Sequence, residues 1–300
     1  MNNGICTNVW TFTGLFNVNL GTQTEIQLGK DIFLCAPNPI LLSVRNDLAL
    51  NKWQSEEIDG VSSFLVHRKP EPQGAEYGRE DHVEQLQNAL MGIQVLKPTE
   101  TIGFIFQGTE SGNTLTRGRT TYRPPMNSGE WARMRALNTS LFVDVAATIK
   151  RVNRLMHGES AEKKNAIYLL QMALEHYHPL IKGLLSVAGL DALFDSQDRW
   201  DFRNKLCQSL GASTPAFPDW NSPIFPVPQF TVEQVAIDLY MLRNKIVHGV
   251  DLRKAARDKN SPVDLSKAVA LVPDLAPRPY SLLLSEAAIY LLCRALQVNM

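Results

Sequence analysis

Residues 231–249 read TVEQVAIDLYMLRNKIVHG, and this segment carries signals for both ends of a helix. Thr231 followed three residues later by Gln234 is the pattern of a capping box, which predicts that the helix begins there. Glycine tolerates the left-handed conformation in which many helices end, so Gly249 predicts the stop. Four apolar side chains recur at helical spacing and predict a stripe that faces a protein core: Val235, Leu239, Leu242 and Ile246.

A second face of this predicted helix is polar. Tyr240, Asn244 and His248 are spaced four residues apart, so they lie one above another, with Arg243 beside them. An imidazole moves protons near neutral pH, and a guanidinium is a planar fork that suits phosphate oxygens. Asn244 can orient the imidazole or donate to a phosphate. The group predicts cleavage of RNA by attack of the 2′-hydroxyl on phosphorus, with His248 transferring the proton and Arg243 stabilising the charge.

The string DLYMLRNKIVHG, residues 238–249, resembles the HEPN superfamily, whose signature is an Arg, a polar residue, a short spacer and a His. It is most similar to the Apea-like HEPN group, in which a Tyr precedes an Arg-Asn or Arg-Ser pair and the segment ends in Ile-Val-His-Gly. Carried over position by position, the resemblance implies that Arg243, Asn244 and His248 are catalytic and that Tyr240 contacts the substrate.

The resemblance also implies a fold and a biology. HEPN proteins are bundles of four to five helices that commonly form homodimers, in which two motifs meet in one composite cleft. Active members are endoribonucleases that need no metal or other cofactor, and many act in anti-phage defence or in toxin–antitoxin systems. Because the superfamily also includes members that only bind, the alternative is a non-catalytic module that recognises nucleic acid or a protein partner.

Helical spacing continues on both sides of this segment. Further helices are predicted near residues 142–156, 167–177, 180–194 and 281–298, with a proline-rich loop at 215–228 that stops helix propagation. A succession of helices without a strand pattern between them predicts an all-α, HEPN-like domain over residues 127–300.

The preceding part of the chain has the period-two pattern of β-strands. Apolar residues alternate in its first strand, at Trp10, Phe12, Phe16, Val18 and Leu20. Further strands are predicted at 26–35, 61–67 and 102–106, with one amphipathic helix near 83–93. We therefore expect an α+β domain over residues 1–126, of unknown role, for which sensing of a regulatory ligand or partner is one interpretation.

Composition bounds the function. Lys and Arg number 30, Asp and Glu number 30, and 44% of the residues are hydrophobic. These values are typical of a soluble globular protein and exclude a globally basic nucleic-acid coat. The N-terminus lacks the pattern of a signal peptide, and Glu286 and Arg294 interrupt the apolar run 282–296, which is shorter than a membrane span. Four cysteines without a C-x-x-C pair favour a reducing compartment, so we expect a cytoplasmic protein without membrane attachment.

A basic-leaning stretch precedes the helical domain. Its cationic residues are Arg117, Arg119, Arg123, Arg133, Arg135, Lys150, Arg151 and Arg154. We predict that Arg117, Arg119 and Arg123 contact RNA, with Tyr122 and Trp131 available to stack on bases. A solvated surface or ion pairs at a domain interface are the alternative.

Other chemistry finds little support in the sequence. His176 and His178 are two residues apart, which on a helix directs them to opposed faces, so a structural role is favoured over a metal site. The chain has no phosphate-binding glycine loop and no serine-hydrolase motif, and Cys207 is expected to be buried. The sequence therefore predicts neither a metal nor a cofactor.

Overall fold

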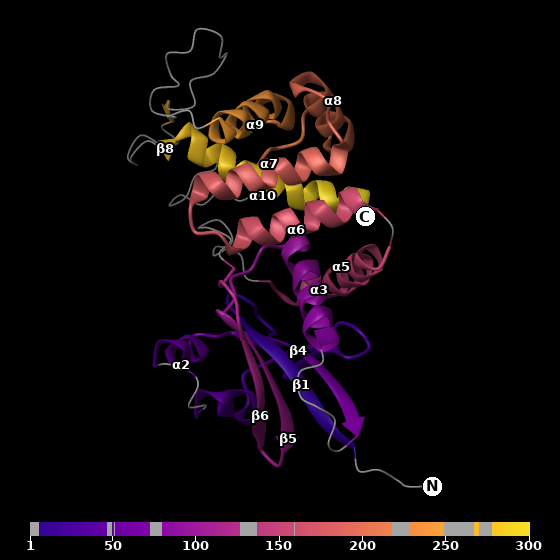
Figure 1. Ribbon diagram of the computed structural model, residues 1–300, viewed down its shortest axis with the longest axis vertical. Coiled ribbons are helices and arrows are strands. Elements are labelled where there is room, and N and C mark those ends of the chain that lie inside the picture. Colours follow the sequence, from indigo (N-terminus) through magenta and orange to yellow (C-terminus); the bar gives the residue numbers. More distant parts are fainter. Residues whose placement is uncertain are drawn as a thin grey trace. The chain divides into compact units, whose positions relative to one another are not determined.

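The computed structural model describes residues 6–46, 50, 52–72, 80–126, 137–158, 160–217, 229–248, 267–269 and 278–300 (Figure 1). The chain divides into two compact units, Met1–His157 and Gly158–Met300. This division comes later than the predicted one after residue 126. The reason is that α5 (Phe142–Met156) packs against α3 (Glu80–Leu96) and so belongs to the N-terminal unit.

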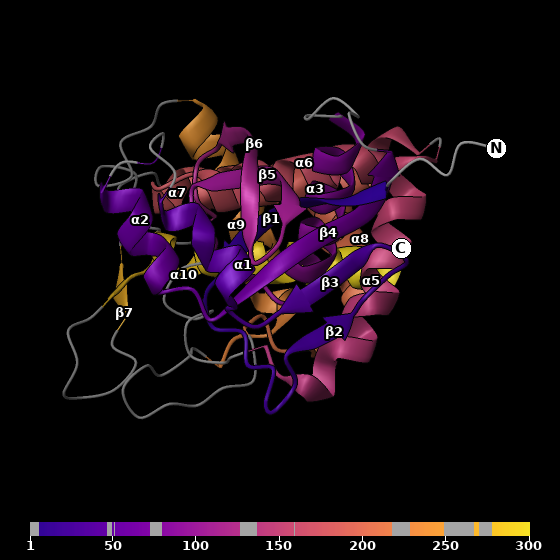
Figure 2. The same cartoon turned by 90° about the horizontal axis from the view of Figure 1, so that it is seen from below.

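The N-terminal unit is built on a six-stranded antiparallel sheet in the order β2-β3-β4-β1-β5-β6 (Figure 2). Its strands are β1 (Cys6–Leu15), β2 (Glu25–Gln27), β3 (Ile32–Cys35), β4 (Ser63–Pro72), β5 (Phe104–Ser111) and β6 (Thr114–Tyr122). The sheet and its helices confirm the α+β character of this part. The predicted strand 26–35 is instead the hairpin of β2 and β3, and β6 was not predicted.

The two faces of the sheet differ in character because successive side chains of a strand point to opposite sides. Trp10, Phe12 and Val66 belong to an apolar core that includes residues of α1 (Pro39–Leu42) and α2 (Lys52–Asp59). The opposite face carries buried polar residues and packs against α3: Thr11, Thr13, Ser63, His67 and Gln107.

The first strand ends earlier than its alternating pattern predicts. Asn17 adopts a left-handed backbone with φ of 58°, which interrupts the extended chain after Leu15. Val18 then forms only an isolated bridge to Leu137, so Phe16, Val18 and Leu20 belong to a loop.

The C-terminal unit is predominantly helical, as predicted. Its helices are α6 (Ala161–Glu175), α7 (Pro179–Phe194), α8 (Arg199–Leu210), α9 (Val232–Val247) and α10 (Tyr280–Asn299). A short pair of strands, β7 (Ala268–Val269) and β8 (Arg278–Pro279), was not predicted. Most of the proline-rich loop lies outside the described residues.

Helix α10 lies at the centre of this unit and runs along α7 (Figure 1). By length and composition it is the one described helix that is long and apolar enough to span a membrane, but most of its residues are buried inside the unit. Its bounds differ by one residue at each end from the predicted helix 281–298; Glu286 pairs with Arg278, and Arg294 is exposed.

Candidate active site

Helix α9 begins as its sequence predicts. The Thr231 hydroxyl accepts a hydrogen bond from the backbone N–H of Gln234 at 3.4 Å, and the backbone N–H of Thr231 donates to Oε1 of Gln234 at 2.8 Å. His248 caps the other end, where its backbone N–H donates to the Asn244 carbonyl at 3.0 Å. Gly249 lies outside the described residues.

The two predicted faces of α9 are both present. Val235, Leu239 and Leu242 are fully buried, while Ile246 is half-buried at the end of the stripe. On the other side Tyr240, Arg243 and Asn244 are half-buried, and His248 is exposed. One helix therefore presents a phenol, a guanidinium, an amide and an imidazole on its accessible side.

The guanidinium of Arg243 is held by residues of other elements. Its Nη2 lies 3.0 Å from Oδ2 of Asp191 on α7, and the two side chains are 28% and 16% exposed. Its Cζ also lies 5.4 Å from the ring centroid of Tyr240, within range of a cation–π contact. The Tyr240 ring in turn packs against Phe202 of α8, with the centroids 5.7 Å apart. Arg243 is thus oriented before any ligand binds.

Asp191 is a site residue that was not predicted from the sequence. Its Oδ1 atom is buried and makes no hydrogen bond of normal geometry with a described residue, although the Ser196 hydroxyl lies nearby, whereas Oδ2 faces Arg243. Burial raises the pKa of the Asp191 carboxyl, and the Arg243 guanidinium acts in the opposite direction. The available signal was weak: a single acidic residue in the apolar sequence of α7.

The side chain of His248 is exposed at the end of α9. In the part of the chain that the structure describes, no hydrogen bond or ion pair engages its imidazole. Asn244 precedes His248 by one helical turn. The hydrogen bond between these two residues joins their backbones, from the His248 N–H to the Asn244 carbonyl. Asn244 and His248, four residues apart, lie one above the other on α9, and the half-buried Arg243 directly precedes Asn244.

The predicted RNA-contacting arginines belong to the N-terminal unit, not to the group around α9. Arg119 is exposed on β6, and Arg123, which follows β6, is half-buried. Arg117 also lies on β6, but its side chain is outside the described residues, as are Trp131, Arg133 and Arg135. The exposed ring of Tyr122 ends the same strand.

The two neighbouring histidines lie in the turn between α6 and α7. Both were expected to lie on one helix, but His176 ends α6 and His178 precedes α7. Nδ1 of His176 accepts a hydrogen bond from the His178 backbone N–H at 3.1 Å. Over the described ranges, no group of three or more His, Cys, Asp or Glu residues could hold a metal ion. Cys207 is half-buried, and burial raises its pKa.

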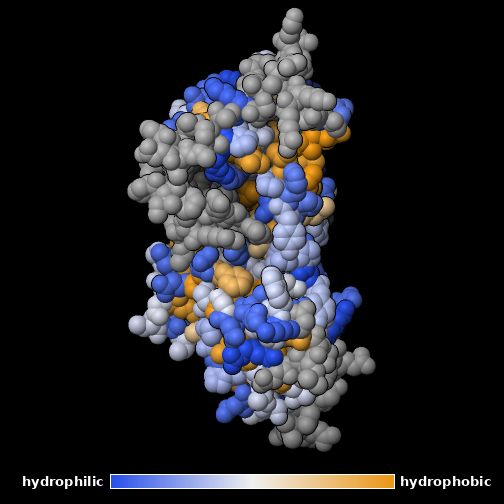
Figure 3. Space-filling model, turned by 90° about the vertical axis from the view of Figure 1, so that its left-hand side faces the viewer, coloured by the Kyte–Doolittle hydropathy of each residue, from blue (hydrophilic) through white to orange (hydrophobic). Residues whose placement is uncertain are grey.

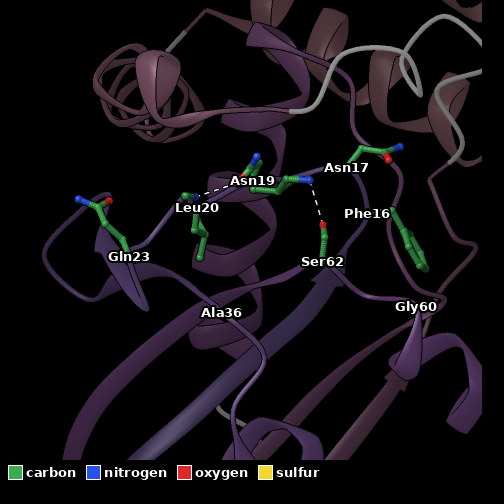
Figure 4. A pocket seen from close by; sticks show the side chains of 10 residues that line it. Phe16, Asn17, Asn19, Leu20, Gln23, Ala36, Gly60 and Ser62 are labelled. Carbon is green, nitrogen blue, oxygen red and sulfur yellow. Dashed lines mark hydrogen bonds between the residues drawn. The ribbon is translucent and has the colours of Figure 1, made fainter.

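A separate cavity of about 480 Å³ lies in the N-terminal unit, beyond the end of β1 (Figure 4). Amide side chains surround it, from Asn17, Asn19 and Gln23, together with the ring of Phe16. Backbone bonds from Leu137 to Asn17 and from Asn19 to Leu137 fix the loop that forms it. Its described lining has no charged side chain.

On the face drawn in Figure 3, hydrophilic and apolar residues are intermingled over both units. The candidate site is defined by the specific side chains around α9. In comparisons with protein-family models, curated proteins and solved structures, none matches the chain.

Proposed function

We propose that the chain is a metal-independent endoribonuclease of the HEPN type whose reaction centre lies on α9. The observation that carries the proposal is the placement of Arg243 between Asp191 and Tyr240, five residues before the exposed imidazole of His248. The resemblance of residues 238–249 to the HEPN signature supports the same assignment. A cytoplasmic effector of antiviral defence, or the toxin of a toxin–antitoxin pair, is the biological role that it implies.

In the proposed reaction, the RNA 2′-hydroxyl loses its proton and its oxygen attacks the adjacent phosphorus. The bond from phosphorus to the 5′-oxygen breaks, and that oxygen takes up a proton. The products are a 2′,3′-cyclic phosphate and a 5′-hydroxyl. His248 moves the proton, and Arg243 stabilises the charge that accumulates on the phosphoryl oxygens. A guanidinium has five N–H donors, so its contact with Asp191 leaves others for the phosphate.

The reaction also favours a homodimer. A base is needed at the attacking oxygen and an acid at the leaving oxygen, on opposite sides of phosphorus, and a single His248 cannot occupy both positions. We propose that two copies of α9 face each other across a two-fold axis, so that one imidazole serves as the base and the other as the acid. The two Arg243 guanidiniums then clamp the phosphate between them.

A binding module without catalysis is the second candidate. The observation that favours it is the ion pair between Arg243 and Asp191, since Asp191 already occupies part of the hydrogen-bonding capacity and offsets the charge of the Arg243 guanidinium. Such a module binds RNA or a protein partner through the same side chains and leaves RNA intact.

Cleavage of RNA by the purified full chain in EDTA tests the proposal. We expect Arg243→Ala and His248→Ala each to lower the rate by roughly 10²-fold or more, with the fold retained. His157→Ala is the matched control, because His157 is also an exposed imidazole that caps the end of a helix, α5. RNA with a 2′-deoxy sugar at the scissile position should resist cleavage. Undiminished cleavage by His248→Ala contradicts the proposal, and binding of intact RNA by the wild type supports the second candidate.

Mixed dimers test the assembly. We expect the wild type to behave as a dimer in light scattering, and a heterodimer of wild type with His248→Ala to lose most of its activity. A fully active monomer at nanomolar concentration, or a heterodimer with undiminished activity per dimer, excludes a site that requires both imidazoles.

A further inference from the structure

The N-terminal unit contains two histidines in contact, both buried and outside the candidate active site. His67 of β4 is fully buried, and His82 in the first turns of α3 is 2% exposed. Their ring centroids lie 4.7 Å apart. Nε2 of His82 lies 3.4 Å from Oε1 of Glu71, a buried residue near the end of β4. The pair therefore joins the sheet to α3.

His67 has little to stabilise a positive charge. Neither of its ring nitrogens makes a hydrogen bond of normal geometry with a described residue, although the Gln85 amide of α3 lies nearby. Its neighbours across the sheet are uncharged: Ile32 on β3 and Thr11 on β1. The charged or titratable groups that face it are Asp31, ahead of β3, Lys69 and Glu71 on β4, and His82 on α3.

The combined effect of burial and of these neighbouring groups disfavours the protonated form of His67. Burial is the largest effect, and together with the neighbouring His82 it lowers the pKa of His67 to about 4. Asp31 acts in the opposite direction without overcoming burial, and Glu71 contacts His82 and Lys69. A proton is therefore bound more tightly when His67 is exposed to water than when α3 covers it.

We propose that the contact of the N-terminal half of α3 with β4 is a proton-sensitive latch, closed while His67 is neutral and opened when acid supplies a proton. The contact that ties α3 to α5 lies further along the helix, where Gly92 approaches the backbone of Ile149, and it need not break. The first residues of α3 include Glu80, Asp81 and Glu84, whose side chains are exposed.

The direction of the response follows from proton linkage. The closed state binds fewer protons than the open state, so its stability is fully present above pH 6.5 and falls as the pH drops toward 4. The pKa of His67 is about 4 in the closed state, and we take its ordinary value of 6.5 for the open state. With these values, the equilibrium constant for opening is about 30-fold larger at pH 5 than at pH 7.5.

Hydrogen exchange on the full chain measures this opening. The first four amides of a helix have no intrahelical partner, so the amides of residues 84–88 report the opening. After correction for intrinsic exchange rates, they should show about a 30-fold larger opening constant at pH 5 than at pH 7.5. The His67→Gln variant, in which position 67 cannot take up a proton, should reduce this ratio to less than about threefold. His157→Gln, at an exposed position of the same unit, should retain the wild-type ratio. Equal pH dependence in wild type and His67→Gln overturns the proposal.

A titration of the wild type keeps the proposal testable if His67→Gln does not fold. The chain has six histidines, so their ring C–H signals are few enough to be followed individually by NMR. We expect the His67 ring to remain neutral in the closed state at pH 5. A His67 signal that titrates near pH 6.5 in the folded protein overturns the latch.

Discussion

Asp191 gives the candidate site a property that the α9 motif alone does not have. A guanidinium on an exposed helix face samples many rotamers, whereas an ion pair with a half-buried carboxylate restricts it. The carboxylate has a second effect, because its negative charge stands near the position proposed for an anionic substrate. Under the proposed function, orientation of Arg243 should favour catalysis, while the charge of Asp191 should oppose RNA binding.

Asp191→Asn separates these two effects. The substitution keeps the size of the side chain and removes the charge, so we expect kcat for RNA cleavage to fall roughly tenfold while RNA binds more tightly. Single-turnover rates and fluorescence anisotropy measure the two quantities.

The matched control for this change is Asp195→Asn. Asp195 is exposed at the end of α7 in a left-handed conformation that asparagine tolerates. This substitution should leave both kcat and the affinity for RNA near their wild-type values. If Asp191→Asn retains the wild-type kcat, Asp191 does not position Arg243 for the reaction.

At the scale of secondary-structure elements, glycines set how closely α7 approaches α10. A Cβ atom at Gly183 would lie 2.8 Å from Cβ and 2.9 Å from Cα of Ser285. A Cβ atom at Gly189 would meet Cδ2 of Leu292 at 2.7 Å. The first contact involves the backbone of α10, which cannot move alone, whereas the second involves the end of a flexible side chain.

Gly183→Ala should therefore destabilise the C-terminal unit more than Gly189→Ala. Alanine raises helix propensity by about 1 kcal/mol at either position. Overpacking at Gly183 should outweigh this gain and lower the free energy of unfolding by about 1–3 kcal/mol. Urea denaturation followed by circular dichroism measures both variants. A Gly183→Ala protein more stable than Gly189→Ala would show that the helices separate easily.

Elements with strong local signals were predictable. The period of α5 and the capping box of α9 depend on residues within one helix, and both are present as predicted. Helix α8 was not predicted because few apolar residues mark its buried face. Its usable signals were the N-cap Asp198 and the glycine at its end, Gly211.

In the candidate site, too, features within one helix were predictable and contacts between helices were not. Arg243, Asn244 and His248 share a face of α9, which spacing alone predicts. The pairing of Arg243 with Asp191 depends on how α7 packs against α9, and no sequence pattern reports that contact. The end of β1 was misplaced for a related reason, since Asn17 breaks the strand by its backbone conformation while the apolar alternation continues.

At the scale of the whole molecule, the two units hold buried groups with opposite responses to acid. In the C-terminal unit, Asp238 is 5% exposed and accepts a hydrogen bond from the Tyr280 hydroxyl at 2.8 Å. Burial raises the pKa of Asp238, as it does for Asp191. A raised carboxyl pKa means that the folded unit binds more protons than the unfolded one, so these groups add stability as the pH falls. His67 has the opposite effect in the N-terminal unit.

Calorimetry should therefore show two transitions that move apart between pH 7 and pH 5. The N-terminal unit should lose about 2 kcal/mol through His67, and the C-terminal unit should keep or gain stability. In His67→Gln, the shift of the N-terminal transition should be largely abolished. Transitions that move together by equal amounts in both proteins would show that the buried groups do not control the response.

The central place of β1 in the sheet has a consequence for synthesis on the ribosome. Its neighbours are β4 and β5, which follow it along the chain, so one edge of β1 stays bare until residues 104–111 have emerged. That edge belongs to a strand containing Val9, Trp10 and Phe12, and an unpaired apolar strand is a template for pairing with other chains. We therefore expect nascent chains that halt before β5 to be the form of this protein most prone to aggregate. A chaperone that covers this edge of β1 should have its largest effect at that stage of synthesis.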